Sequence, residues 1–207
     1  MIAASIAVVL TLVLDACTSG ASSTGASATL TGDVRSPALR VGTATLPDVA
    51  PGRPDRPFAF RAPKGKLLFV MWGYTSCPDV CPTTMADLGK ALRALGGDAP
   101  KVETAFVTID PARDTPAKLT GYLTSFTSGG HAIRTTDAAA LAKAEAAFQV
   151  ESSVTKKADG TVEVAHTARS FVVDDHGRVV VEWPYGTGSD GMTHDLKILV
   201  ARLTSSS

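Results

Sequence analysis

The segment Cys77-Pro78-Asp79-Val80-Cys81-Pro82 decides the fold, because an apolar run precedes it and a helical pattern follows it. Residues 67–72 read Leu-Leu-Phe-Val-Met-Trp, and so continuous an apolar run predicts a buried strand. Pro82 suits the first turn of a helix and Gly96-Gly97 suits its end, so the pattern predicts a helix over 82–95. Apolar residues recur within it at helical spacing, at Met85, Leu88, Leu92 and Leu95.

Both cysteines of this segment are expected at or just before the N-terminus of that helix. Unpaired backbone N–H groups and the helix dipole favour a thiolate over a thiol at such a place. Thiolates attack disulfides and bind soft metals, so Cys77 and Cys81 can close as a disulfide or hold one metal ion together. A purely stabilising disulfide is disfavoured, because so short a loop constrains the unfolded chain little.

The composition gives no sign of a nucleic-acid partner. The chain has 207 residues, with 20 basic and 20 acidic side chains and a formal charge of zero. Hydrophobic residues make up 44% of the sequence, as is ordinary for a globular protein. The body of the chain contains no apolar run of about 20 residues, so an internal membrane span is not expected.

The N-terminus differs from the rest of the chain. Residues 2–14 are apolar, and Cys17 opens a polar run rich in Ser, Thr, Gly and Ala. This arrangement resembles a bacterial lipoprotein signal, which is cut before a cysteine that then carries lipid. It predicts a signal over 1–16, a flexible tether over 17–37 and a domain over 38–207. Lipid on Cys17 would anchor this domain to the outer face of the bacterial cytoplasmic membrane. Disulfides are permitted there, and Cys77 and Cys81 would be each other's only intramolecular partner.

Strand and helix patterns alternate along the predicted domain, and its end predicts a β-hairpin and a helix. Strand patterns lie over 43–45, 58–60 and 101–109, and helix patterns lie over 115–125 and 137–148. The hairpin is predicted over 170–173 and 178–183. The last helix carries the apolar residues Met192, Leu196, Leu199, Val200 and Leu203, and a tail follows over 204–207. This order predicts an α/β thioredoxin-like sandwich, with a central mixed β-sheet flanked by helices. In that fold the dithiol lies at the start of the first helix. The loop that enters the hairpin packs beside the dithiol, and in this chain that loop contains His166.

Three motifs stand in a fixed order along the domain. Residues 73–82 read Gly-Tyr-Thr-Ser-Cys-Pro-Asp-Val-Cys-Pro, residues 108–116 read Thr-Ile-Asp-Pro-Ala-Arg-Asp-Thr-Pro, and His166-Thr167 precedes a strand. Together they resemble the Sco/SenC family, thioredoxin-like copper-binding proteins of cytochrome c oxidase assembly. The resemblance covers roughly residues 47–203. It departs from the family pattern at Thr167 and Trp72, neither of which is a proposed ligand.

The resemblance implies that Cys77, Cys81 and His166 bind copper together. Copper(I) accepts thiolates and imidazole and tolerates a low coordination number, which suits such a set. The family further implies a metallochaperone that delivers copper to the copper-site subunit of cytochrome c oxidase. Asp110, at the end of the second buried strand, is expected to orient a ligand without binding the metal. Without the motif, His166 would be interpreted as an ordinary surface or hydrogen-bonded histidine.

The same cysteines also allow an enzymatic function. A thiol–disulfide oxidoreductase would use Cys77 and Cys81 as catalytic residues and cycle them through a mixed disulfide. It would reduce cysteines of the oxidase copper site or of other exported proteins, and would need a thioredoxin-like reductant. The Cys-x3-Cys spacing and His166 favour the copper carrier over this alternative. A peroxidase of the same fold is a third alternative, in which paired thiols and His166 have no required role.

Overall fold

The computed structural model describes residues 29–53 and 56–205. The predicted signal, residues 1–16, and the predicted lipid attachment site, Cys17, lie outside the described residues. Among the helices that are described, none is both long and apolar enough to cross a membrane.

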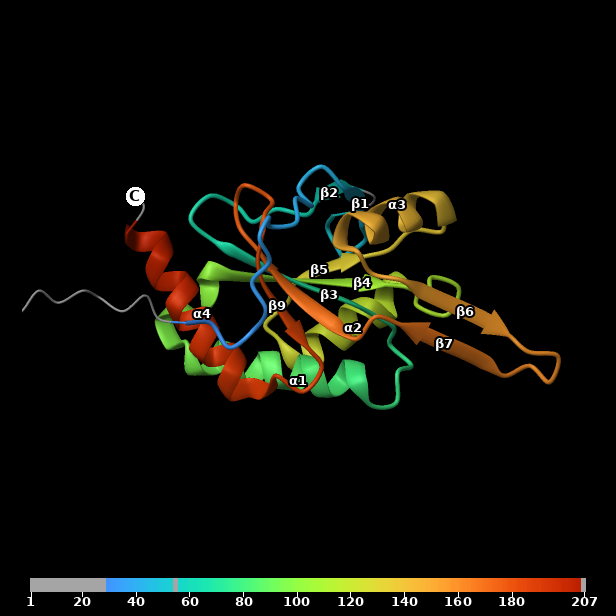
Figure 1. Cartoon of the computed structure of the whole chain (residues 1–207). Coiled ribbons are helices and arrows are strands. Elements are labelled where there is room, and N and C mark those ends of the chain that lie inside the picture. Colours follow the sequence, from blue (N-terminus) through green and yellow to red (C-terminus); the bar gives the residue numbers. More distant parts are fainter. Residues whose placement is uncertain (1–28, 54–55, 206–207) are drawn as a thin grey trace, which may run out of the picture.

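Within the described residues, seven strands form one mixed sheet in the order β2-β1-β5-β4-β3-β8-β9 (Figure 1). At its centre β3 (Leu67–Gly73), β4 (Val102–Thr108) and β5 (His131–Ile133) run parallel. The predicted hairpin, β8 (Arg169–Val173) and β9 (Val179–Pro184), continues the sheet antiparallel to β3. On the other side, β1 (Thr45–Asp48) and β2 (Arg56–Ala59) form a second hairpin beside β5.

Helices cover both faces of this sheet, which confirms the predicted α/β sandwich (Figure 1). On one face α1 (Val80–Ala94), α2 (Pro116–Phe126) and α4 (Gly188–Ser205) bury their apolar stripes against alternate residues of β3, including Phe69 and Met71. On the other face α3 (Ala138–Phe148) packs against the intervening residues, including Val70 and Trp72. This division follows from the two-residue period of a strand, which sends successive side chains to opposite faces.

The helix ends follow the predicted signals with small shifts. Thr115 accepts a hydrogen bond from the backbone N–H of Lys118, and Asp137 accepts from two N–H groups at the start of α3. α1 begins at Val80, two residues before the predicted start, so Cys81 lies within its first turn and Cys77 precedes it. It ends before a 3₁₀ turn, η1 (Gly96–Lys101), and α4 continues to Ser205, into the predicted tail.

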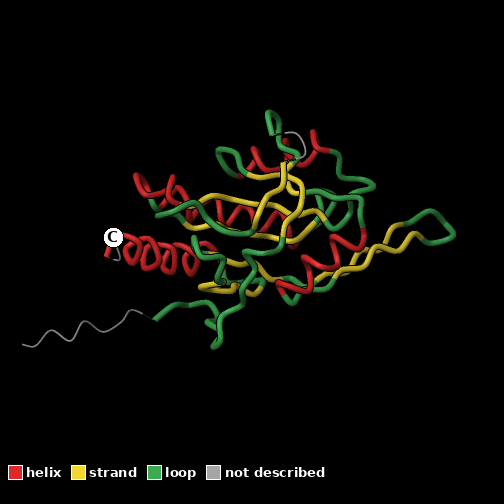
Figure 2. The backbone as a smooth tube through the Cα atoms, turned by 90° about the horizontal axis from the view of Figure 1, so that it is seen from above, coloured by secondary structure: helices red, strands yellow, loops and turns green. Residues whose placement is uncertain are grey.

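A two-stranded arm is the main element absent from the sequence prediction. β6 (Ser152–Lys156) and β7 (Val162–His166) pair antiparallel and form a separate sheet. Figures 1 and 2 both show this arm projecting beyond the rest of the domain. His166 is therefore the last residue of a strand and sits at the base of the arm, whereas the sequence placed it in a loop entering the hairpin.

The packed domain begins earlier than the predicted boundary at residue 38. The backbone N–H groups of Thr31 and Gly32 donate to the buried carboxylate of Asp195 in α4, at 2.6 and 2.9 Å. Asp33 exchanges two backbone hydrogen bonds with Glu182 of β9, at 2.8 and 2.9 Å. Residues 31–33, which the sequence assigned to the flexible tether, are thus fixed to the domain.

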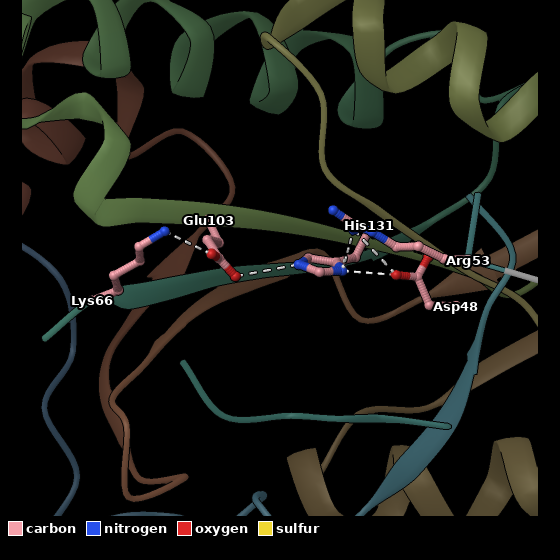
Figure 3. A network of polar contacts seen from close by, with 5 residues as sticks. All are labelled: Asp48, Arg53, Lys66, Glu103 and His131. Atoms are coloured by element: carbon pink, nitrogen blue, oxygen red, sulfur yellow. Dashed lines mark hydrogen bonds and ion pairs between the residues drawn. The ribbon is translucent and has the colours of Figure 1, made fainter. Parts of the chain in front are cut away.

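A chain of polar contacts around His131 joins strand and loop segments at the end of the sheet where β4 and β5 begin (Figure 3). Lys66 and Glu103 are 2.9 Å apart, and the Glu103 carboxylate lies 3.3 Å from His131 Nε2. The other imidazole nitrogen of His131 lies 2.8 Å from the carboxylate of Asp48, which also binds Arg53 at 3.3 Å. The network ties the β1–β2 hairpin to the parallel core, so His131 has a structural role.

Candidate metal centre

Two of the three predicted ligands touch. Cys81, in the first turn of α1, and His166, at the end of β7, are separated by 3.8 Å between Sγ and Nε2. Cys77, on the loop after β3, accepts a hydrogen bond at 3.4 Å through its Sγ from the backbone N–H of Cys81. Both cysteines are free thiols in this structure. The fold therefore gathers the three residues, although 85 positions separate Cys81 from His166.

The orientation of His166 presents a lone pair to Cys81. Its Nδ1 lies 3.0 Å from the backbone carbonyl oxygen of Thr167, which can only accept a hydrogen bond. Nδ1 must therefore carry the proton of the neutral ring, which leaves Nε2 unprotonated. This is the arrangement that metal-binding histidines usually show, with one ring nitrogen fixed by a carbonyl group and the other free to bind.

Close packing fixes the position of Cys81 against the sheet. Cys81 is fully buried, and a Cβ built on Gly73, the last residue of β3, would lie 2.7 Å from the Cys81 sulfur. No side chain at position 73 could be accommodated without moving that sulfur. Gly73 therefore lets the first turn of α1 approach the end of β3.

The two thiols differ in acidity, and only one behaves as the sequence predicts. Burial raises the pKa of Cys77, but hydrogen bonds from the backbone N–H groups of Cys81 and Asp79 outweigh this, so its pKa is lowered overall. Burial raises the pKa of Cys81 well above the usual thiol range, and the neighbouring Cys77 adds to the effect. The expected helix-terminal activation of both thiols is thus wrong for Cys81, because desolvation outweighs the helix dipole there.

A buried carboxylate that the sequence prediction missed holds the cysteine loop. Asp114 accepts hydrogen bonds from the backbone N–H and the hydroxyl of Thr75, at 3.0 and 2.5 Å, and from the hydroxyl of Thr108 at 2.6 Å. Both Asp114 and Thr108 are fully buried. Because Thr75 precedes Cys77 by two residues, this clamp connects the cysteine loop to the end of β4.

Asp110, the residue expected to orient a ligand, contacts none of the three. Its carboxylate pairs with Arg113, and its backbone N–H donates to Thr108. The Arg113 guanidinium lies 5.7 Å from the centre of the Tyr74 ring, and this ring meets the His166 ring edge-on at 6.2 Å. Asp110 is therefore linked to the site indirectly, through Arg113 and Tyr74 on one side and through Thr108 on the other.

The residues present fit a soft metal in chemical type, although not yet in position. Two sulfurs and one imidazole nitrogen are the donors that copper(I) prefers, and zinc accepts the same set. Over residues 29–53 and 56–205, however, no three Cys, His, Asp or Glu side chains already lie close enough to hold one ion. Three-ligand binding therefore requires a shift of side chains, and Cys77, which is only half buried, precedes the helix on an exposed loop.

The chain resembles proteins of one family in sequence and in fold. The family model described as SCO1/SenC matches residues 53–201. The SCO2-like protein of Rickettsia conorii is 41% identical over 63 residues, which are 30% of this chain and 31% of that protein. Protein SCO1, mitochondrial, of Saccharomyces cerevisiae is 40% identical over 63 residues, 30% of this chain and 21% of that protein. The matched segment thus spans a third or less of these curated relatives.

Solved structures match over a larger share. The structure of Bradyrhizobium japonicum ScoI with copper bound is 34% identical, with a TM-score of 0.61, and the match covers 74% of this chain and 94% of that one. The apo Sco1 protein of Thermus thermophilus is 27% identical, with a TM-score of 0.64, over 88% of this chain and 100% of that one. Since the family model spans most of the folded domain, the chain belongs to the SCO1/SenC family.

Proposed function

We propose that this protein is a copper metallochaperone of cytochrome c oxidase assembly, which carries copper on Cys77, Cys81 and His166. The observation that supports it best is the contact of the Cys81 sulfur with Nε2 of His166, at 3.8 Å, beside a second thiol and with the other ring nitrogen facing the Thr167 carbonyl. The copper-bound ScoI structure, 34% identical to this chain, supports copper as the cargo.

A site of two thiolates and one imidazole suits transfer as well as binding. Copper(I) is stable with few ligands, so a partner can add a ligand before one of the three leaves. The recipient in this proposal is the copper-site subunit of cytochrome c oxidase.

The location proposed for this activity is the outer face of the cytoplasmic membrane, with lipid on Cys17. Because residues 31–33 are fixed to the domain, only 13 residues, 18–30, lie between Cys17 and Thr31. A segment of that length reaches at most about 45 Å when fully extended. Such a tether would raise the effective concentration of the domain at a membrane-bound recipient without a docking interface.

A second function, thiol–disulfide exchange, is supported by the difference between the two thiols. Cys77 is half exposed and its pKa is lowered, as expected of the thiol that attacks a substrate disulfide. Cys81 is buried with a raised pKa, as expected of the thiol that later resolves the mixed disulfide. In this function the pair would reduce exported proteins and would be re-reduced by a thioredoxin-like partner.

His166→Ala in the full chain distinguishes the two functions, because it removes a proposed ligand and leaves both thiols in place. The carrier function predicts a folded variant that still forms its disulfide but binds copper(I) about 100-fold more weakly and fails to support oxidase maturation. His176→Ala is the matched control, since that side chain is 71% exposed in a turn and should leave copper affinity unchanged.

Two other results would decide against parts of this proposal. Unchanged copper affinity and full oxidase maturation in His166→Ala would remove the ligand assignment and favour the reductase. Tight copper(I) binding by protein whose Cys77 and Cys81 are oxidised to a disulfide would show that the ligands lie elsewhere.

A further inference from the structure

The side chain of Tyr74 lies between the cysteine loop and the arm that carries His166. Its ring meets the His166 ring edge-on, with 6.2 Å between the centroids and 89° between the planes. Its backbone carbonyl accepts a hydrogen bond at 3.2 Å from the backbone N–H of Cys77, which closes a turn over 74–77. Tyr74 therefore contacts two of the three proposed ligands, from a position directly after the end of β3.

The His166 ring needs a contact beyond its hydrogen bond to stay turned toward Cys81. Its Nδ1 lies 3.0 Å from the Thr167 carbonyl, and the ring can swing about this single bond. Nε2 lies 3.8 Å from the Cys81 sulfur, and a thiol is a weak hydrogen-bonding group. Within the described residues, the strand that ends at His166 has a single partner strand, and such a pair is stabilised little by its own hydrogen bonds. The edge-on contact with Tyr74 opposes the swing, because aromatic rings favour this arrangement.

The Tyr74 ring is itself held by Arg113. The guanidinium carbon of Arg113 lies over the ring, 5.7 Å from its centre, and the same side chain pairs with the buried carboxylate of Asp110. The buried Nη2 of Arg113 has no hydrogen-bond partner among the described residues, and the face of an aromatic ring attracts such a cation. The ion pair with Asp110 thus fixes the guanidinium, and the guanidinium fixes the ring.

We propose that Tyr74 is a positioning residue of the metal centre, whose ring, held by Arg113, keeps the His166 imidazole turned toward Cys81 before copper binds. This inference rests on the proposed copper-carrier function. Among the described residues, the three ligands do not yet lie close enough to hold one ion, so binding requires a shift of side chains. An imidazole that already faces Cys81 reduces this shift, because only molecules in the competent arrangement bind the ion.

Tyr74→Leu in the full, metal-free chain tests the orientation of His166 itself. A ring that swings loses its bond to Thr167, and with it the preference for one tautomer. We therefore expect the ring nitrogens of His166, observed by NMR with the imidazole neutral, to approach the averaged signals of the exposed His176. Tyr74→Phe keeps the ring and should keep the wild-type signals. Unchanged His166 signals in Tyr74→Leu would refute the positioning role.

Copper(I) affinity, measured by competition with a chromophoric chelator, tests the consequence for binding. Tyr74→Leu should lower the affinity about fivefold, which corresponds to about 1 kcal/mol, the contribution typical of one aromatic pair. In the His166→Ala background the same change should have no further effect, since Tyr74 acts through the imidazole. An equal loss in both backgrounds would overturn the assignment, because Tyr74 would then act on the cysteine loop or on stability alone.

Phe58→Leu is the matched control. The Phe58 ring contacts a different histidine ring, that of His131, with 4.3 Å between the centroids. This variant loses an aromatic–histidine contact away from the metal centre, and it should keep both the His166 signals and the copper affinity of wild type. A similar loss of affinity in Phe58→Leu would show that Tyr74→Leu reports only general destabilisation, which would also overturn the assignment.

The NMR measurement needs no copper, so failure of this inference can be distinguished from failure of the proposed function. If wild-type protein binds copper and neither the His166 signals nor the affinity change in Tyr74→Leu, the positioning role alone fails. If wild-type protein binds no copper, the carrier function fails, and the role of Tyr74 in a metal centre fails with it even where the His166 signals change.

Discussion

Replacing Asp114 by asparagine tests whether the buried clamp positions the cysteine loop. The side chain keeps its shape, but one of its two acceptor oxygens becomes an NH2 group. Asp114 accepts three hydrogen bonds, two from Thr75 and one from Thr108. An asparagine can retain part of this set through its remaining oxygen, while its new amide donor faces a site built for a carboxylate.

The expected loss follows from the number and type of these bonds. Hydrogen bonds to a charged group contribute about 1.5–3 kcal/mol each, so losing one and weakening another should destabilise the protein by about 3 kcal/mol. For a protein of this length, that corresponds to a fall in Tm of roughly 6–12 °C. Because Thr75 lies two residues before Cys77, copper(I) affinity should also fall, by about tenfold.

Thermal unfolding of the reduced, metal-free protein and chelator competition measure the two effects separately. Asp98→Asn is the control, since Asp98 is half exposed, pairs only with Lys101 and should change neither quantity appreciably. A destabilised Asp114→Asn protein with wild-type copper affinity would refute the positioning role. Wild-type stability would refute the inference that the three hydrogen bonds hold the loop.

Three further predictions concern the thiols, the charge network and the anchor. In reduced, metal-free protein, an alkylating reagent should modify Cys77 well before Cys81, because Cys77 is the more exposed thiol and the one whose pKa is lowered. Mass spectrometry measures the two rates, and equal rates would contradict this prediction. Burial raises the pKa of Glu103, but hydrogen bonds from Lys66 and His131 outweigh it and lower the pKa, so Glu103→Gln should be less stable than wild type at neutral pH. This difference should disappear as the pH falls through the lowered folded-state pKa, below the ordinary glutamate value of about 4.3, and a difference that persists at lower pH would contradict the ionic explanation. Cys17→Ser should release the protein from the membrane fraction, whereas unmodified Cys17 in native protein would exclude the lipid anchor.

Most of the sheet and its helices could be predicted because their signals are local. The apolar run of β3, the N-cap Asp137 and the turn between β8 and β9 each lie within a few residues of the element they define. The β6–β7 arm was missed although Asp159-Gly160, a typical hairpin turn, precedes a run in which Val162 and Val164 alternate with polar residues or alanine. Those strands expose most of their side chains, so the contrast between apolar and polar faces is weak.

The spacing of residues in the motif does not show whether Asp110 or Asp114 holds the cysteine loop. Both carboxylates lie in one motif after β4, and both are buried. A hydrogen bond from the backbone N–H of Asp114 to the carbonyl of Asp110, at 3.0 Å, closes a single helical turn. The position of this turn against β3 determines which carboxylate faces the cysteine loop. That position depends on the packing of the sheet and cannot be predicted from the motif.

The three proposed ligands are held by three different parts of the fold, which explains why no single window of sequence contains the site. Cys81 is fixed by close packing of α1 on Gly73, and the loop of Cys77 is held through Thr75 by Asp114. His166 is oriented by the Thr167 carbonyl at the base of a two-stranded arm. A two-stranded sheet is stabilised little by its own pairing, so the position of His166 depends on contacts at the base of the arm, such as the bond to Thr167. A sulfur buried in the core combined with an imidazole at the base of the arm suits the proposed carrier function, because one ligand can leave while the other retains the ion.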